Sequence, residues 1–286
     1  MSKLAPVIAL SHGGGPMPLL SDPSHRFIVQ SLQERVPKIL SLHGTDRPRA
    51  ILLVTAHWTT ASPTVTSGRN PDLIYDYYGF PPESYEIEYP ARGEPEVAAE
   101  VAAAMQAEGL EGVRQDADRG WDHGVFVPLK LVEPDAGSIP PIVQVSVLAG
   151  EDPVLHLRMG RALRGLRARG VAVVGSGFAS FHNLRLMMSA MASSSPDPDL
   201  LETSRRWNEA VTAAVSLPRE PDRWDALARW RDMPGGKVMH PPRRGEHFLP
   251  LLVCAGAASD GEQAGFYKDL FAGFEIYTYY WADVDV

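Results

Sequence analysis

Three short, largely apolar runs lie along the chain, and each leads to a histidine. Residues 7–10, 51–58 and 171–177 are largely apolar stretches that are rich in branched or small side chains. Runs of this length and composition predict buried β-strands. His57 lies at the carboxyl end of the second run, and His12 and His182 follow the first and the third. Because an open α/β sheet builds its site at the carboxyl edge of the strands, we expect a histidine-rich metal centre there.

Between these runs, the apolar positions take on the period of a helix. This spacing predicts helices over residues 22–42, 95–107, 152–170, 199–216 and 220–230, and one around Cys254. Residues 142–147 and 275–281 predict two further strands, the second antiparallel or at a sheet edge. Strands that alternate with helices indicate the α/β class. We therefore expect residues 1–286 to form a single domain, with a mixed, mostly parallel central sheet flanked by helices and a metal site at the strand C-terminal ends.

Residues 71–93 show neither the helical nor the strand period, but they are rich in aromatic side chains and prolines. A long loop of this composition is costly to leave in water, so we expect it to cover a pocket or a partner subunit.

Composition narrows the class of protein. The chain has 286 residues, of which 44% are hydrophobic and 22% charged, which is enough for a sizeable core. A net charge of -8 argues against a nucleic-acid partner. Since no signal peptide and no membrane-spanning apolar run is present, and Cys254 is the single cysteine, we expect a soluble cytoplasmic protein without disulfides. Cys254 lies in an apolar run and is interpreted as a core residue rather than a nucleophile.

The nine histidines are the candidate chemistry. Imidazole is a common ligand of iron, zinc, copper and nickel. His12 and His57 lie at strand ends beside small residues, which leaves room for an ion. His247 follows Glu246 at a helix start, and neighbouring helical residues diverge by about 100°, so only one of the two can face the metal. The third ligand is therefore an imidazole or a carboxylate.

The other histidines fall into two groups. His123 and His182 are flanked by turn-forming residues and are candidates for acid–base catalysis. His240 is a candidate to line the same pocket from a loop. No site role is assigned to the histidines expected at helix surfaces or ends, which are His25, His43 and His156.

Two glycine-rich turns lack the full pattern of a phosphate or dinucleotide site. These turns, at residues 13–15 and 175–177, are better explained by backbone that must turn tightly beside a crowded site.

Six motifs occur in a fixed order along the chain. They are Ser11-His12-Gly13-Gly14-Gly15-Pro16, Thr55-Ala56-His57-Trp58, Tyr78-Gly79-Phe80-Pro81 with Tyr89-Pro90, Trp121-Asp122-His123-Gly124, His182-Asn183-Leu184, and Glu246-His247-Phe248-Leu249-Pro250-Leu251. Together they resemble the class III extradiol ring-cleavage dioxygenases, specifically the 4,5-DOPA dioxygenase-like branch. The resemblance runs from about residue 7 to about residue 255, which is nearly the whole chain.

The resemblance implies a non-haem metal-dependent enzyme that opens the aromatic ring of a catechol-type substrate with O₂. Fe(II) is the metal expected for activity, and Zn(II) is able to occupy the site on isolation. By motif match, His12, His57 and His247 are metal ligands, with Glu246 as the alternative because the broader superfamily uses two histidines and a glutamate. His182 matches a further ligand or an acid–base residue, and His123 matches the histidine that handles a substrate or oxygen proton.

The expected partners are a small aromatic substrate and O₂, without nucleic acid or membrane, and homo-oligomers are possible. Trp58, Tyr78, Phe80 and His240 are the expected substrate-binding residues. A carboxylate on the catechol would need a basic partner, for which the candidates are Arg185, Arg243 and Arg244.

Two other functions use the same histidines. One is a zinc-dependent hydrolase, in which the metal activates water. The other is a non-catalytic metal or small-molecule binding protein that keeps the pocket. Consumption of O₂ distinguishes the dioxygenase from both.

Overall fold

A computed structural model describes residues 4–192, 196–284 and 286. Its centre is an eight-stranded sheet with the order β4-β3-β5-β2-β6-β1-β8-β7. The four middle strands are parallel to one another, and they are β5 (Ile142–Leu148), β2 (Ala50–Thr60), β6 (Val171–Gly177) and β1 (Val7–Ser11). Strands covered on both faces are rich in apolar residues along their length, which is why these strands stand out in the sequence. The expectation of a single-domain α/β fold with a mostly parallel sheet is confirmed.

The sheet becomes mixed at its edges. β8 (Phe274–Trp281) is antiparallel to β1, and β7 (Gly265–Phe271) is antiparallel to β8. At the other edge, β3 (Thr64–Thr66) is antiparallel to β5 and parallel to β4 (Arg114–Asp116). The antiparallel pairing expected for residues 275–281 is therefore correct, whereas β4 and β7 are additions to the predicted strands.

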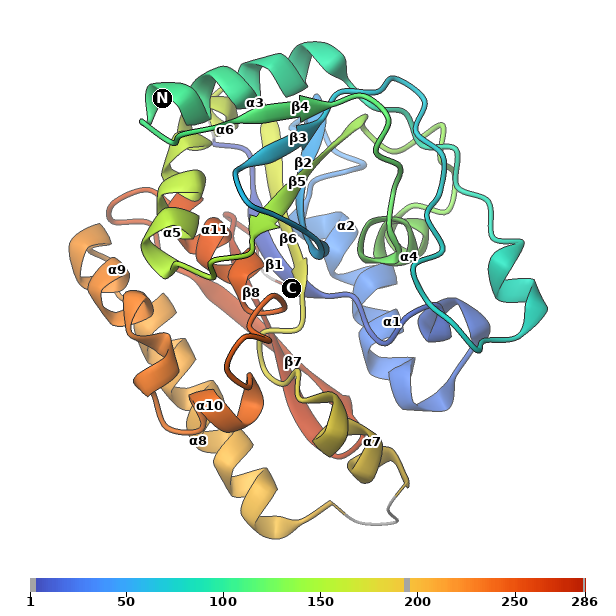
Figure 1. Ribbon diagram of the computed structural model, residues 1–286, viewed down its shortest axis with the longest axis vertical. Helices are drawn as coiled ribbons and strands as arrows, with labels where there is room; N and C mark the ends of the chain where they lie inside the picture. The colour runs from blue at the N-terminus through green and yellow to red at the C-terminus, as the bar shows by residue number, and fades with distance from the viewer. Residues whose placement is uncertain (1–3, 193–195, 285) are drawn as a thin grey trace.

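Helices cover both faces of the sheet (Figure 1). On one side lie α1 (Arg26–Glu34), α2 (Val36–Ile39) and α4 (His123–Val132), and on the other lie α5 (Pro153–Ala162), α6 (Arg164–Arg167) and α11 (Leu249–Ala257). The remaining helices are α3 (Pro95–Ala107), α7 (Leu184–Ala192), α8 (Pro198–Val215), α9 (Glu220–Ala228) and α10 (Gly236–Met239). Short 3₁₀ turns are η1 (Met17–Leu20), η2 (Pro23–His25), η3 (Pro82–Tyr85) and η4 (Trp230–Asp232). No helix in these described ranges is both long and apolar enough to cross a membrane.

Two of the predicted helices are interrupted in the structure. The helix expected over residues 22–42 consists of η2, α1 and α2, and Pro37 in α2 cannot donate a helical hydrogen bond. The helix expected over residues 152–170 begins as predicted, because the Asp152 side chain accepts hydrogen bonds from the amides of Val154 and Leu155. It is divided at Leu163 into α5 and α6.

Strand β2 differs from its prediction near His57, a candidate metal ligand. The strand does not end just after His57, as the run over residues 51–58 predicts, but continues to Thr60. Its pairing with β5 shifts register between Val54 and Thr59. An irregular stretch of this kind turns a side chain away from the regular alternation of the strand. His57 is therefore presented by a distorted strand rather than by a strand end.

Two histidines expected at helix surfaces or ends are core residues. His25 and His156 both have an exposed fraction of 0%. The Gly14 amide donates to Nε2 of His25, and the Leu148 amide donates to Nε2 of His156. Each ring satisfies a buried backbone donor, which is why it is drawn into the core. Cys254 is buried as predicted.

His156 makes the stability of the fold sensitive to acid. Burial lowers the pKa of His156 from 6.5 to about 4. The unfolded chain therefore binds a proton at His156 more readily than the folded chain does. The contribution of His156 to the stability of the fold is fully present above pH 6.5 and is lost as the pH falls toward 4. Between about pH 7.5 and about pH 4.5 we expect a loss on the order of 2.5 kcal/mol in unfolding free energy from this residue.

Urea unfolding of the wild type and His156→Gln across this pH range measures the effect. Glutamine keeps an acceptor for the Leu148 amide but does not titrate, so the variant should lose less stability in acid. Parallel pH dependences for the two proteins would contradict the prediction.

Candidate metal centre

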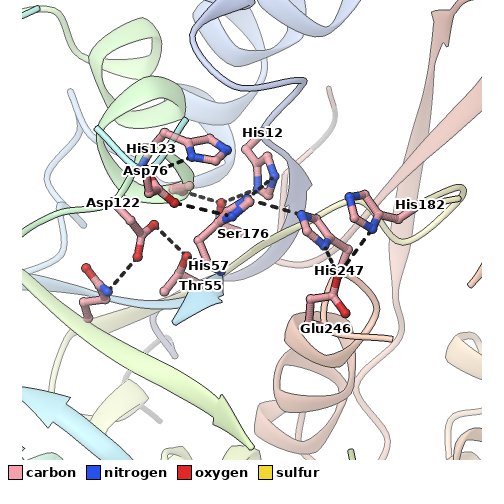
Figure 2. Close-up of polar contacts among 12 residues, drawn as sticks. His12, Thr55, His57, Asp76, Asp122, His123, Ser176, His182, Glu246 and His247 are labelled. Atoms are coloured by element: carbon pink, nitrogen blue, oxygen red, sulfur yellow. Dashed lines mark hydrogen bonds and ion pairs between the residues drawn. The ribbon is translucent and has the colours of Figure 1, made fainter. Parts of the chain in front are cut away.

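Three imidazole rings meet at the carboxyl edge of the parallel strands (Figure 2). His12 directly follows β1, His57 lies within β2, and His247 precedes α11. The Nε2 atoms of His12 and His57 lie 3.1 Å apart, and those of His57 and His247 lie 3.2 Å apart. The sequence expectation that these three histidines converge is thus met by the geometry.

The spacing of these nitrogens fits a single metal ion. Two nitrogen ligands at about 2.0–2.1 Å from a tetrahedral ion lie roughly 3.3 Å from each other. Burial lowers the pKa of all three histidines well below 6.5, and the neighbouring imidazoles lower it further. The rings are therefore neutral at neutral pH, and neutral imidazole is the form that binds metal. The donor set fits a divalent transition metal.

Each of the three rings has a polar partner at its other nitrogen. Nδ1 of His12 lies 3.0 Å from the Ser176 hydroxyl oxygen, and Nδ1 of His247 lies 3.2 Å from a carboxylate oxygen of Glu246. Nδ1 of His57 lies 3.6 Å from a carboxylate oxygen of Asp76. Partners of this kind orient a ligating imidazole and favour the tautomer whose Nε2 lone pair is free. The arrangement is that of a supported ligand set.

Glu246 lies on the Nδ1 side of His247, away from the three Nε2 atoms. Burial raises the pKa of Glu246, and so does the charge of Glu151. Of the two alternatives for a third ligand, the geometry thus favours His247, with Glu246 as the group that orients it.

His123 occupies one flank of the ligand set (Figure 2). It is the first residue of α4, and its ring centroid lies 3.8 Å from that of His57. Its backbone amide and its Nδ1 both lie close to the same oxygen of Asp76, at 2.9 and 2.8 Å. Burial alone would raise the pKa of Asp76, but the hydrogen bonds and charge of His123 lower it. The ionised Asp76 carboxylate leaves Nε2 of His123 free to handle a proton.

His182 occupies the opposite flank (Figure 2). Its ring is stacked on that of His247, with centroids 3.3 Å apart and planes at 15°. An imidazole binds a metal in its own ring plane, so two stacked parallel rings cannot direct lone pairs at one ion. Nδ1 of His182 lies 3.6 Å from the same Glu246 oxygen that His247 approaches. The two flanks are therefore alike. Asp76 lies between His57 and the outer histidine His123, and Glu246 lies between His247 and the outer histidine His182.

The crowding around the centre explains the glycine at the end of β6. A Cβ atom on Gly177 would lie 2.4 Å from the carbonyl oxygen of His247. Any larger residue would push the start of α11, and with it the His247 ring, away from β6. Residues 175–177 belong to strand β6, so the tight turn predicted there is wrong, whereas the crowding predicted beside them agrees with this close approach.

The expected substrate-binding residues lie in different environments. Trp58 is buried with the Arg119 guanidinium 5.1 Å from its ring, and Phe80 packs over Gly15. Tyr78 has an exposed fraction of 91%, whereas its neighbour Tyr77 is buried with its ring 5.8 Å from that of His123.

His240 does not line the centre. It has an exposed fraction of 0%, its Nε2 donates to the Ala179 carbonyl at 2.8 Å, and it packs against Trp207, Trp230 and Phe248. The structure places His240 in the core instead of on a pocket wall, because its ring satisfies a buried carbonyl.

Residues that support the rings were not singled out from the sequence. Besides Asp76 and Ser176, they include Asp122, a buried carboxylate that accepts hydrogen bonds from Thr55, Arg119 and Gln144. Thr55 in turn accepts a hydrogen bond from the His57 amide. The only feature of the sequence that pointed to Asp122 was its position next to His123 in a predicted turn.

Comparison with known proteins identifies the family to which the chain belongs. The sequence profile of LigB, the catalytic LigB subunit of aromatic ring-opening dioxygenase, matches residues 6–277. The chain belongs to the LigB family. A relative named "Dioxygenase tasH" from Hapsidospora irregularis is 60% identical over 99% of this chain and 87% of its own length. The 4,5-DOPA dioxygenase extradiol of Beta vulgaris is 33% identical over 89% of this chain and 87% of that protein.

The LigB assignment agrees with a solved structure. An uncharacterized protein from Escherichia coli K12 superposes with a TM-score of 0.75 and 28% identity, covering 97% of this chain and 100% of that one. Membership in the LigB family supports a metal-dependent oxygenase that acts on a small molecule with O₂. The histidine cluster is the group of side chains able to hold that metal.

Proposed function

We propose that the protein is an extradiol dioxygenase that opens the ring of a catechol-type substrate with O₂. The observation that carries this proposal is the convergence of the Nε2 atoms of His12, His57 and His247 on one point. Three ligands on one side of an ion leave positions for two substrate oxygens and for O₂. The 4,5-DOPA dioxygenase extradiol name of the relative in Beta vulgaris supports the same chemistry.

Fe(II) is the metal we propose for activity, with Zn(II) as an occupant after isolation, since nitrogen-rich sites bind both. When bound, the iron supplies a positive charge that acidifies the catechol hydroxyls and a route for electrons between ring and O₂. We also propose a cytoplasmic location, which the single buried cysteine supports.

The two outer histidines are proposed to move protons. Because Nδ1–H of His123 donates to Asp76, its Nε2 is free to accept a proton from the substrate or deliver one to oxygen. His182 is proposed to act as the second acid–base residue, since its stacking on His247 opposes a role as fourth ligand. The nearby negative charge of Asp76 or Glu246 would stabilise each imidazolium that forms.

Aromatic residues of the loop and of β2 are proposed to hold the ring and exclude water. Phe80 and Trp58 remain candidates for these contacts, and Tyr77 joins them because its ring lies beside His123. Tyr78, which is almost fully exposed, would reach a substrate only by movement of the loop.

The test is anaerobic loading with Fe(II), followed by aerobic addition of a panel of substituted catechols. We expect a coloured ring-opened product and consumption of one O₂ for each catechol, with no turnover by the zinc-loaded protein. Stoichiometric iron without a product from any catechol would refute the proposal. Hydrolytic activity of the zinc form without O₂ consumption would instead indicate the hydrolase.

A further inference from the structure

A carboxylate from the end of β5 reaches the segment that carries His247. Glu151 follows β5, and its Oε1 atom accepts a hydrogen bond of 2.9 Å from the Gly245 amide. Its Oε2 atom accepts a hydrogen bond from the guanidinium of Arg231, which belongs to η4. Because Gly245 directly precedes Glu246 and His247, three distant parts of the chain meet beside this candidate ligand. We call Glu151, Arg231 and Gly245 the Glu151 cluster.

The Glu151 cluster is closely packed and partly shielded from water. The side chains of Glu151 and Arg231 are exposed by only 17% and 27%, so water weakens their attraction less than that of a surface pair. The central carbon of the Arg231 guanidinium also lies 4.1 Å from the centroid of the Trp230 ring. A Cβ atom on Gly245 would lie 2.6 Å from Nη2 of Arg231 and 3.1 Å from the Trp230 ring. The absence of a side chain at residue 245 is therefore what allows this segment to approach Glu151 and Arg231.

The backbone around His247 is attached to both neighbours of β2. The His247 carbonyl oxygen accepts a hydrogen bond of 3.0 Å from the Phe178 amide, just beyond β6. The Gly245 amide donates to Glu151, just beyond β5. β5 and β6 lie on either side of β2, the strand that carries His57. The two attachments therefore set the position of the His247 ring relative to that of His57.

The backbone of Glu151 is strained. Its φ of 49° lies in the left-handed region, which is unfavourable for residues with a Cβ atom and is readily adopted by glycine. A strained residue keeps such a conformation only where surrounding contacts hold it. The hydrogen bonds of the Glu151 carboxylate with Gly245 and Arg231 supply such contacts. The turn after β5 thus directs a charged side chain at the His247 segment, although glycine would form the same turn with less strain.

We infer that Glu151 and Arg231 are positioning residues for the metal centre, which act on the His247 ligand through Gly245. Arg231 directs the Glu151 carboxylate at the Gly245 amide, since a charged hydrogen bond limits the rotation of the carboxylate. The bound amide in turn holds the His247 backbone, so that its Nε2 atom stays 3.2 Å from that of His57. A ligand held in place beforehand binds a metal more tightly, because less freedom is lost on binding. The inference rests on the proposed function only in taking His247 as a metal ligand.

Metal binding by Glu151→Ala and Glu151→Gln tests the inference, with Glu220→Ala as the matched control. Glu220 pairs with Arg164, and its side chain is exposed by 18%, close to the 17% of Glu151. Competition with a chromogenic chelator measures the affinity for Zn(II), and the visible absorption of the Co(II) form reports the ligand geometry. We expect Glu151→Ala to weaken Zn(II) binding by about tenfold and to change the Co(II) spectrum, whereas Glu220→Ala should change neither. Glu151→Gln keeps an acceptor for the Gly245 amide and should lose less affinity than Glu151→Ala.

Hydrogen exchange of the metal-free proteins gives a second measurement. The Gly245 amide donates to Glu151, so its exchange should be about tenfold faster in Glu151→Ala than in the wild type or in Glu220→Ala. Equal Zn(II) affinities and Co(II) spectra for the two alanine variants would overturn the inference. If Glu151→Ala does not fold, Arg231→Gln replaces it, and an unchanged Zn(II) affinity in that variant is the contrary result. None of these measurements uses a catechol or O₂, so a failure of ring opening would refute the proposed function and leave this inference standing.

Discussion

Replacing His247 by alanine is expected to remove the bound metal and to lower turnover by roughly a thousandfold or more. The His247 Nε2 atom lies 3.2 Å from that of His57, so its loss leaves two nitrogens where three converged. Metal content after anaerobic loading and desalting measures the first effect, and ring opening of a catechol measures the second. His43→Ala, which replaces an exposed histidine, is the matched control and should keep both.

The companion variant Glu246→Gln decides between the two candidates for the third ligand. Because Glu246 approaches Nδ1 of His247, the variant should retain metal with an affinity lowered by about 10- to 100-fold, as for other outer partners of a ligand. If Glu246→Gln lost the metal while His247→Ala kept it, the carboxylate would be the ligand.

Replacing Asp122 by alanine is expected to reduce the unfolding free energy by about 3 kcal/mol. Its carboxylate is fully buried and accepts hydrogen bonds of 2.8, 2.9 and 2.9 Å from Thr55, Arg119 and Gln144. Burial raises the pKa of Asp122, as does the charge of Asp76, whereas Arg119 and Thr55 lower it. Removal would leave a guanidinium, an amide and a hydroxyl without their acceptor, and each pays for desolvation.

Urea unfolding at neutral pH measures this loss of unfolding free energy. A second aspartate–arginine pair, on the protein surface, provides the control. Asp225 pairs with Arg229 on the exposed surface of α9, so Asp225→Ala should change the unfolding free energy by at most about 0.5 kcal/mol. Equal unfolding midpoints for the two variants would show that the buried network contributes nothing. Asp122→Ala should also weaken metal binding, because Thr55 holds the His57 amide.

The central sheet could be predicted from the sequence because its middle strands are buried and rich in apolar residues. Residues 51–54 and 171–174 are read correctly for this reason. β7 was missed since its exposed and buried residues alternate and it pairs only with β8, while β4 has three residues. The irregular course of β2 at His57 depends on a register shift against β5, which the local sequence pattern does not encode.

The converging histidines could be predicted because each lies in or next to an apolar run that the sequence pattern locates. Their supporting groups could not, because they come from distant parts of the chain. Ser176 is 164 residues from His12, and Asp76 is 47 residues from His123 in a loop without periodicity. The burial of His240 could not be predicted from the sequence either, because it depends on packing against three aromatic rings from separate elements.

The three converging imidazoles are 45 and 190 residues apart along the chain. An ion held by all three would act as a reversible cross-link between the first strand and the last helix of the fold. Such a tether exists only when β1, β2 and the start of α11 are packed together, so metal binding depends on folding and stabilises the folded chain by mass action. Removal of the metal by a chelator should then make the chain more sensitive to proteases, and no fragment that lacks His12 or His247 could assemble the full ligand set.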